Sequence, residues 1–250
     1  MLPIEDVTSL PLLYHLNSEP WTNPEAASLI YEMKYRRPSA GHEPIDLPSP
    51  GQESALLKLL RERRSCRQFL SRKMTLAELA TLLGGACGIA ISKQLGPAIK
   101  CFLRTAPSAG ALFPLDLYLA TQEIEGMEPG LQHYDVLNHS LKILQRGPVV
   151  EEVAKCLLEP KSVRNANAVI LISACFEPTL KKYGARGYRY ILLEAGHVAQ
   201  NLCLLATAQG LGSLCVGGFI DSRLNRLLGL DGVTQAAIYC VVVGYSAESP

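Results

Sequence analysis

The chain has 250 residues, 48% of them hydrophobic and 19% charged, so it can bury a substantial core as one large domain or two small ones. This composition excludes a disordered or highly charged protein. The 24 basic and 23 acidic residues nearly cancel, so nucleic acid and anionic membranes are not expected as main partners, and any bound anion must be held by a local cluster of charge.

The N-terminal part of the chain is predicted to be an arm. A short helix is expected over residues 25–37. Residues 37–51 contain four prolines and little periodicity, which is typical of a linker or of a strap along the surface. We therefore expect residues 1–52 to form an arm and strap, and residues 53–250 to form one folded domain.

Regular structure is predicted from residue 53 onward. The leucines of residues 53–63 indicate a helix, and Thr75 with Glu78 has the pattern of a capping box at the start of a second one. Residues 116–122 and 168–176 have the apolar character of strands. The second of these strands is apolar enough to be buried on both faces.

The clearest periodicity in the chain, over residues 191–209, predicts a long helix. Its inward positions recur in steps of four and three, at Ile191, Ala195, Val198, Leu202, Leu205 and Gln209. Gly210 and Gly212 are expected to end it. A strand over 213–217, a helix near 221–228 and a strand over 236–244 complete the prediction. Because helices and strands are mixed without strict alternation, the α+β class is favoured.

Positive charge is concentrated at the end of the helix predicted over residues 53–63, in RERRSCRQF (61–69). Guanidinium groups offer paired donors in a fixed fork, which suits phosphate, so this stretch is a candidate anion site. A solvated charged turn is the alternative, and the stretch alone leaves it open. The candidate residues are its four arginines together with Ser65.

A loop of small residues lies within RTAPSAGALFPLDLY (104–118). Pro107 restricts the backbone, while Ser108, Ala109 and Gly110 add little side-chain bulk. Such a loop lets main-chain groups approach a flat ligand. An ordinary tight connection into a strand is the alternative.

A glycine-rich stretch, GLGSLCVGGF (210–219), has some likeness to a dinucleotide fingerprint. Cys215 stands where that fingerprint requires glycine, and the stretch follows a helix, so a Rossmann motif is excluded. Gly217 and Gly218 remain candidates for presenting backbone N–H groups to a cofactor ring.

Two proton carriers, Lys182 and Tyr183, precede the long helix in LKKYGARGYRY (180–190). Their reference pKa values are about 10.4 and 10, so a role as a base requires a pKa lowered by roughly two to three units. Burial lowers the pKa of lysine, and positive charge from Arg186 and Arg189 would lower both values. The alternative is a surface lysine over a packed tyrosine. His197 and Glu194 are left outside the catalytic set.

The eight cysteines lie mostly in apolar runs and never form C-x-x-C, which excludes a disulfide or zinc framework. We expect buried thiols in a reducing compartment, and no metal site. The first residues, MLPIEDVTSLPLLYHL, lack the basic start and clean apolar run of a signal peptide. No apolar run approaches the ~20 residues that span a bilayer. A cytoplasmic protein is expected.

The order of these stretches resembles the nitroreductase superfamily. The similarity covers about residues 53–244 and is closest to the SagB/ThcOx-type (McbC-like) branch, flavin dehydrogenases that oxidise azoline rings in peptides. It rests on RRSCRQF, MTLAELATLLGGACGI, PSAGALFPLDLY, KKYGARGYRYILLEAGHVAQNL and GLGSLCVGGF. The resemblance implies a central, mainly antiparallel sheet flanked by helices, with the long helix, residues 187–210, at a homodimer interface.

The resemblance also implies FMN as the cofactor, bound between two subunits. Arg63, Arg64, Ser65 and Arg67 would hold its phosphate and ribityl chain. Pro107, Ser108, Ala109 and Gly110 would approach the same flavin from the other subunit, and Val216, Gly217 and Gly218 would lie along the ring. Many members complete the phosphate site with a basic residue near the C-terminus, whereas no Lys or Arg follows Arg226 here.

The implied activity is dehydrogenation of an azoline ring to an azole, in which FMN accepts the hydride and Lys182 with Tyr183 removes the proton. A cyclodehydratase or a peptide substrate would be the partner. One alternative is a nitro- or quinone reductase supplied by NAD(P)H. The other is a catalytically silent flavin-binding subunit of a complex.

Overall fold

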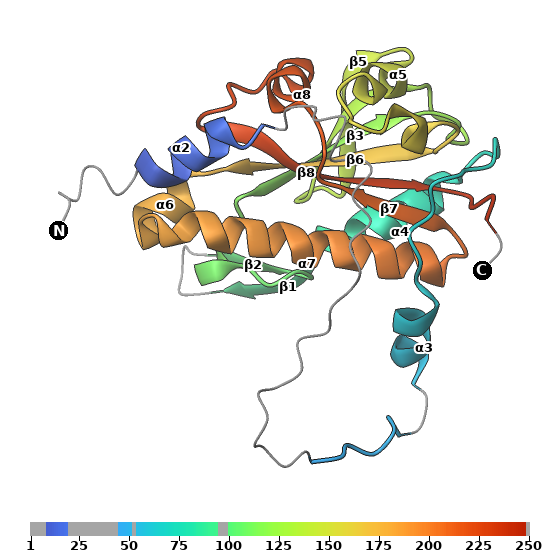
Figure 1. Ribbon diagram of the computed structural model, residues 1–250, viewed down its shortest axis with the longest axis horizontal. Coiled ribbons are helices and arrows are strands. Elements are labelled where there is room, and N and C mark those ends of the chain that lie inside the picture. The colour runs from blue at the N-terminus through green and yellow to red at the C-terminus, as the bar shows by residue number, and fades with distance from the viewer. Residues whose placement is uncertain (1–8, 20–44, 52–53, 95–99, 249–250) are drawn as a thin grey trace.

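A computed structural model describes residues 9–19, 45–51, 54–94 and 100–248 (Figure 1). The helix expected over 25–37 and most of the proline-rich strap lie outside these residues. The described end of the strap, 45–51, is exposed and has no regular structure. The arm does contain one helix that was not predicted, α2 (Ser9–Asn17). The division of the chain at residue 52 stays a prediction.

The fold is organised around a six-stranded sheet in the order β5-β4-β3-β6-β8-β7, in which every neighbouring pair is antiparallel. The α+β class and the antiparallel central sheet are therefore confirmed. The predicted strands are present with nearly the expected bounds. They are β3 (Leu115–Thr121), β6 (Ala168–Cys175), β7 (Gly212–Val216) and β8 (Gln235–Gly244).

Helices cover both faces of the sheet (Figure 1). One hydrophobic cluster joins β3, β6 and β8 to α4 (Leu76–Cys87) and α7 (Arg186–Ala208). A second cluster joins the opposite face to α5 (Val149–Ala154) and α8 (Asp221–Leu228). Because β6 lies between these layers, seven of its eight residues are buried, as its unbroken apolar sequence predicted.

The long helix α7 packs against α4, β7 and β8 through the face that the sequence predicted. Ile191, Ala195, Val198 and Leu202 are buried. By length and mean hydropathy α7 is the one described helix that could cross a membrane, and 44% of its most apolar window is buried inside the protein. The core helix of a soluble protein passes the same test, and α7 carries the buried carboxyl of Glu194.

Several elements were not predicted. Two of them are strands of the central sheet, β4 (Gly130–Asp135) and β5 (Ser140–Arg146). Two more, β1 (Ile89–Gln94) and β2 (Lys100–Arg104), form a separate hairpin. The short helix α6 (Glu177–Tyr183) precedes α7. β5 is a solvent-facing edge strand with little buried surface, so its sequence lacks the apolar pattern that identified the central strands.

The capping box at the start of α4 is confirmed. The backbone N–H of Glu78 donates to Thr75 Oγ1 at 3.1 Å, and the backbone N–H of Thr75 donates to Glu78 Oε2 at 2.8 Å. We expect Thr75→Ala to lower the free energy of unfolding by about 1 kcal/mol, measured by urea denaturation. Thr81→Ala on the same helix is the control, because Thr81 only donates to the carbonyl of Ala77. Equal stability of the two variants would contradict this role of the cap.

Candidate functional site

The first part of the candidate site is formed where the chain leaves α3 (Ala55–Glu62) and runs beside β7. The backbone N–H of Cys66 donates to the carbonyl of Ser213 at 2.9 Å, and Ser65 pairs with Ser213 in a parallel bridge. From Ser213, β7 leads to Val216 and Gly217 across four residues, about 13 Å. The candidate phosphate residues and the candidate ring residues therefore belong to one continuous surface.

The arginines of this surface have different surroundings. Arg63 is half-buried, and Arg67 is exposed. Arg64 Nη1 donates to the carbonyls of Arg61 at 2.6 Å and Arg63 at 2.9 Å, so it satisfies free acceptors at the end of α3. Part of the Arg64 guanidinium is thus committed to the protein backbone.

The same turn already binds an anionic group of the protein. The backbone N–H groups of Arg67 and Gln68 donate to Glu248 Oε1 at 2.8 and 3.1 Å. A pair of backbone donors that binds a carboxylate has the chemistry that a phosphate oxygen requires. The residues present therefore fit the anionic end of FMN, although a carboxylate rather than a basic side chain lies here near the C-terminus.

The ring part of this surface has open backbone at Gly217. Gly217 is exposed, and a Cβ added there would meet only ring carbons of Tyr239, the nearest at 3.7 Å. Gly218 is more confined, because its added Cβ would lie 3.1 Å from Leu158 Cδ1. A flat ring can approach the main chain at Gly217 without displacing a side chain.

The second part of the site is the loop that contains Pro107, Ser108, Ala109 and Gly110. Ser108 Oγ accepts the backbone N–H of Phe113 at 2.9 Å, which closes the loop on itself. Gly110 has φ +64°, and a Cβ there would lie 2.5 Å from both Lys182 Nζ and Tyr183 Oη. The two predicted proton carriers thus lie directly over this loop, and glycine is the residue that leaves them room.

Lys182 and Tyr183 are at the end of α6, and Gly184 turns the chain into α7 with φ +58°. Lys182 is exposed, and its Nζ lies 5.4 Å from the centre of the Tyr183 ring. Tyr183 in turn meets the edge of Tyr190, with ring centroids 5.2 Å apart. Arg186 instead lines a hollow beside α2 with Pro11 and Tyr188.

A cavity of about 270 Å³ lies beside the loop. Its lining combines loop residues that the sequence predicted with α7 residues that it did not: Pro107, Ser108, Ala109, Tyr190, Leu193, Glu194 and His197. The spacing of Tyr190, Glu194 and His197 by four and three places them on one face of α7. That spacing could have been recognised in the sequence. By itself, however, it does not show whether the shared face lines a cavity or packs into the core.

Glu194 is a buried carboxyl in this cavity, with 4% of its surface exposed. Burial raises its pKa above the ordinary value, against the opposing effects of the hydrogen bond with Ser108 and the positive charge of Arg104. Glu194 therefore keeps its proton to a higher pH than a solvated glutamate. Glu194 lies outside the catalytic set expected from the sequence, and the structure places it next to the loop.

The two parts of the site are separated within one chain. The loop contacts Glu194, whereas β7 contacts α7 at Cys203, where the two thiols of Cys203 and Cys215 are 3.5 Å apart. Glu194 and Cys203 are nine residues apart along the helix, a rise of about 14 Å. The structure brings Lys182 and Tyr183 to the loop, and Arg63 to β7, but it does not bring these two groups together.

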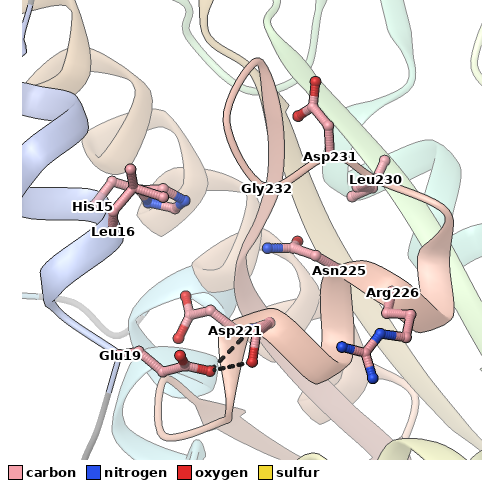
Figure 2. Close-up of a pocket in the computed structure, with 10 residues that line it drawn as sticks. His15, Leu16, Glu19, Asp221, Asn225, Arg226, Leu230, Asp231 and Gly232 are labelled. Atoms are coloured by element: carbon pink, nitrogen blue, oxygen red, sulfur yellow. Dashed lines mark hydrogen bonds between the residues drawn. The ribbon is translucent and has the colours of Figure 1, made fainter.

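A different cavity, of about 360 Å³, lies between α2 and α8 and contains none of the predicted residues (Figure 2). Figure 2 shows carboxyl groups of Glu19, Asp221 and Asp231 around it, with Arg226 at one side. Glu19 Oε1 accepts the backbone N–H and the hydroxyl of Ser222 at 3.0 and 2.8 Å. This concentration of negative charge is unsuited to a phosphate.

Comparison with known proteins agrees with the fold and the motifs. The model of the family described as "Nitroreductase family" matches residues 60–245. The MJ1384 protein of Methanocaldococcus jannaschii, a nitroreductase by name, is 36% identical over 184 residues, which cover 74% of this chain and 88% of that protein.

A second relative is the microcin B17-processing protein McbC of Escherichia coli, 30% identical over 147 residues that cover 54% of this chain and 52% of McbC. Among solved structures, the E. coli microcin synthetase McbBCD complex with truncated pro-MccB17 bound has a chain matched with a TM-score of 0.74 at 23% identity, over 99% of both chains. A Desulfovibrio desulfuricans protein solved in complex with FMN matches with a TM-score of 0.54 at 20% identity, over 79% of this chain and 89% of that one. The expected resemblance to the McbC-like proteins is confirmed.

Proposed function

The chain belongs to the nitroreductase family of oxidoreductases, and we propose that it is an FMN-dependent enzyme that dehydrogenates azoline rings, thiazoline or oxazoline, in a modified peptide or a related small substrate. The observation that carries this proposal is the contact between Gly110 and the pair Lys182 and Tyr183. A reductase that only delivers electrons needs no base beside its substrate, whereas ring oxidation releases a proton as well as a hydride.

We propose that the working unit is a homodimer with two equivalent FMN sites. Arg63, Arg64, Ser65, Arg67 and residues 216–218 of one subunit would face residues 107–110 of the other. The separation of these groups along α7 supports this arrangement, because one chain does not surround a ligand with both.

Exposed apolar side chains also support a dimer. Leu193 on α7 is 55% exposed and Leu56 on α3 is 57% exposed, and α3 buries none of its residues. Exposed apolar side chains that gather on a helix face mark a surface for interaction with another protein. A second copy of the chain, related by a two-fold axis, would cover both helices.

In the proposed reaction, bound FMN supplies the hydride acceptor. Lys182 and Tyr183 hold the base that takes the proton from the azoline ring. The half-buried Tyr190 contacts Tyr183 and, with the buried Glu194, lines the cavity beside the loop. Glu194, with its raised pKa, would donate a hydrogen bond in its protonated form.

A second candidate function, reduction of nitro compounds or quinones with electrons from NAD(P)H, is favoured by the similarity to MJ1384 over most of both chains. The similarity to McbC, a peptide-processing protein by name, favours the first. A cyclodehydratase that makes the azoline, and its peptide, would then be the partners. We place the enzyme in the cytoplasm, where its eight free thiols stay reduced.

The decisive experiment supplies the purified chain with FMN and compares two reactants. A synthetic peptide that contains one thiazoline should be converted to the thiazole, detected as the loss of two hydrogens by mass spectrometry. NADPH added without oxygen should leave the flavin absorbance nearly unchanged. Rapid bleaching by NADPH together with an unchanged peptide would favour the reductase, and no flavin binding at all would favour a silent subunit.

A further inference from the structure

Two cysteine thiols face each other beside the proposed ring site. Cys203 lies on α7 and Cys215 on β7, and their sulfur atoms are 3.5 Å apart, within hydrogen-bond distance for sulfur. All eight cysteines are free, and among the residues that the structure describes no other pair of thiols is in such contact. The pair joins the interior face of the central helix to the strand that ends at Val216.

The surroundings of the two thiols differ. Burial raises the pKa of other thiols in the core, such as Cys87, to about 11. The pKa of Cys215 is instead lowered by the hydrogen bond between the two thiols, with help from Tyr239 and from the positive charge of Arg63, in spite of burial. The same hydrogen bond raises the pKa of Cys203. Cys215 is therefore the more acidic of the two thiols.

Access to the pair comes from the side of Cys215. Cys203 is 3% exposed, whereas Cys215 is half-buried. A thiolate that is reachable and has a second thiol next to it is the arrangement of a redox-active pair, with one sulfur to react and one to resolve. A buried structural thiol needs neither feature.

We propose that Cys203 and Cys215 form a redox-active dithiol that a small peroxide, such as hydrogen peroxide, converts to a disulfide. The Cys215 thiolate attacks one oxygen of the peroxide, the O–O bond breaks, and a sulfenic acid and hydroxide result. Cys203 then attacks the Cys215 sulfur, the S–S bond forms, and the sulfenic oxygen leaves as hydroxide. The Cys203 proton and one proton from solvent convert the hydroxides to water. In total, two thiols are oxidised and one peroxide is reduced to two waters.

The disulfide would tie α7 to β7 immediately before Val216 and Gly217. It would therefore tighten the strand that borders the proposed ring site. Reduced flavins that meet oxygen produce hydrogen peroxide, so the proposed enzyme would itself be a local source of the oxidant. The dithiol chemistry does not depend on that function, because any peroxide in solution serves.

The test uses the full chain without added FMN, so that it is independent of the proposed activity. After treatment with a small excess of hydrogen peroxide, free thiols are counted in denaturant with a chromogenic disulfide reagent. We expect two fewer than the eight of the untreated chain. Peptide mapping without reduction should find one linked pair of peptides, containing Cys203 and Cys215.

Single variants assign the roles. Cys215→Ser should abolish formation of this disulfide. Cys203→Ser should accumulate a sulfenic acid at position 215, trapped by dimedone and located by mass spectrometry. Cys175→Ser removes another half-buried thiol, on β6, and should behave as the wild type. Retention of all eight thiols, a disulfide between other cysteines, or dimedone labelling elsewhere in Cys203→Ser would overturn the proposal.

Discussion

Arg63→Ala is expected to weaken FMN binding by about 30-fold. Removing a charged donor from a phosphate costs about 2 kcal/mol, and each 1.4 kcal/mol is a factor of ten in affinity. Arg63 is half-buried beside β7, and Arg64 is partly occupied by the carbonyls of Arg61 and Arg63. Arg63 therefore has more guanidinium donors available for a phosphate than Arg64 has.

The measurement is a titration of FMN fluorescence against protein, repeated with riboflavin. Because riboflavin has no phosphate, its weaker binding should be the same in Arg63→Ala and in the wild type. Arg164→Ala is the matched control, since Arg164 is an exposed arginine that lines a separate hollow with Pro160 and Glu151. Equal FMN affinity in Arg63→Ala and Arg164→Ala would show that this turn does not hold the phosphate.

Lys182→Ala is expected to keep FMN and to lose turnover of a thiazoline peptide by about 10²–10⁴-fold, the usual contribution of a positioned general base. Lys182 Nζ and Tyr183 Oη both lie where a side chain on Gly110 would be, so they define the open position over the loop. FMN would be bound mainly by the arginines of residues 63–67 and by residues 216–218, which this substitution leaves intact. Binding and chemistry should therefore separate in this variant.

The two readouts are flavin content, from the absorbance of the purified protein, and thiazole formation, followed by mass spectrometry. Lys181→Ala is the control, because Lys181 is the preceding exposed lysine on the same helix. Tyr183→Phe should show a smaller loss if the phenol relays the proton to Lys182. Normal turnover by Lys182→Ala would mean that the base lies elsewhere, and Glu194 would then be the next residue to replace.

The predicted and observed elements differ in an instructive way. The elements that the sequence predicted best pack against the hydrophobic core on one or both sides, and this packing requires a regular apolar pattern. They are helices α4 and α7 and strands β3, β6 and β8. The edge strand β5 and the hairpin of β1 and β2 carry much exposed surface, so no such pattern marks them. Each of them pairs with a strand that is its neighbour in the sequence, but this pairing leaves no apolar periodicity to detect.

The candidate site was predicted in the same uneven way. Residues that belong to a continuous motif, such as Ser108 and Gly110 or Lys182 and Tyr183, could be predicted because the motif includes them. Tyr190, Glu194 and His197 were missed as cavity residues, and Cys203 and Cys215 as a pair. A helix spacing shows which residues share a face, but it does not show what that face meets.

The amino-acid sequence by itself determined the class of the fold, the long core helix, the capped helix before it and the motifs of the family. These are local properties, set by periodicity and by residue type. The tertiary structure alone decided that Gly110 lies under Lys182 and Tyr183, that Glu194 is buried beside the loop, and that the thiols of Cys203 and Cys215 meet. The physical reason is that these contacts join segments far apart in the chain, whose approach is fixed by packing on the sheet.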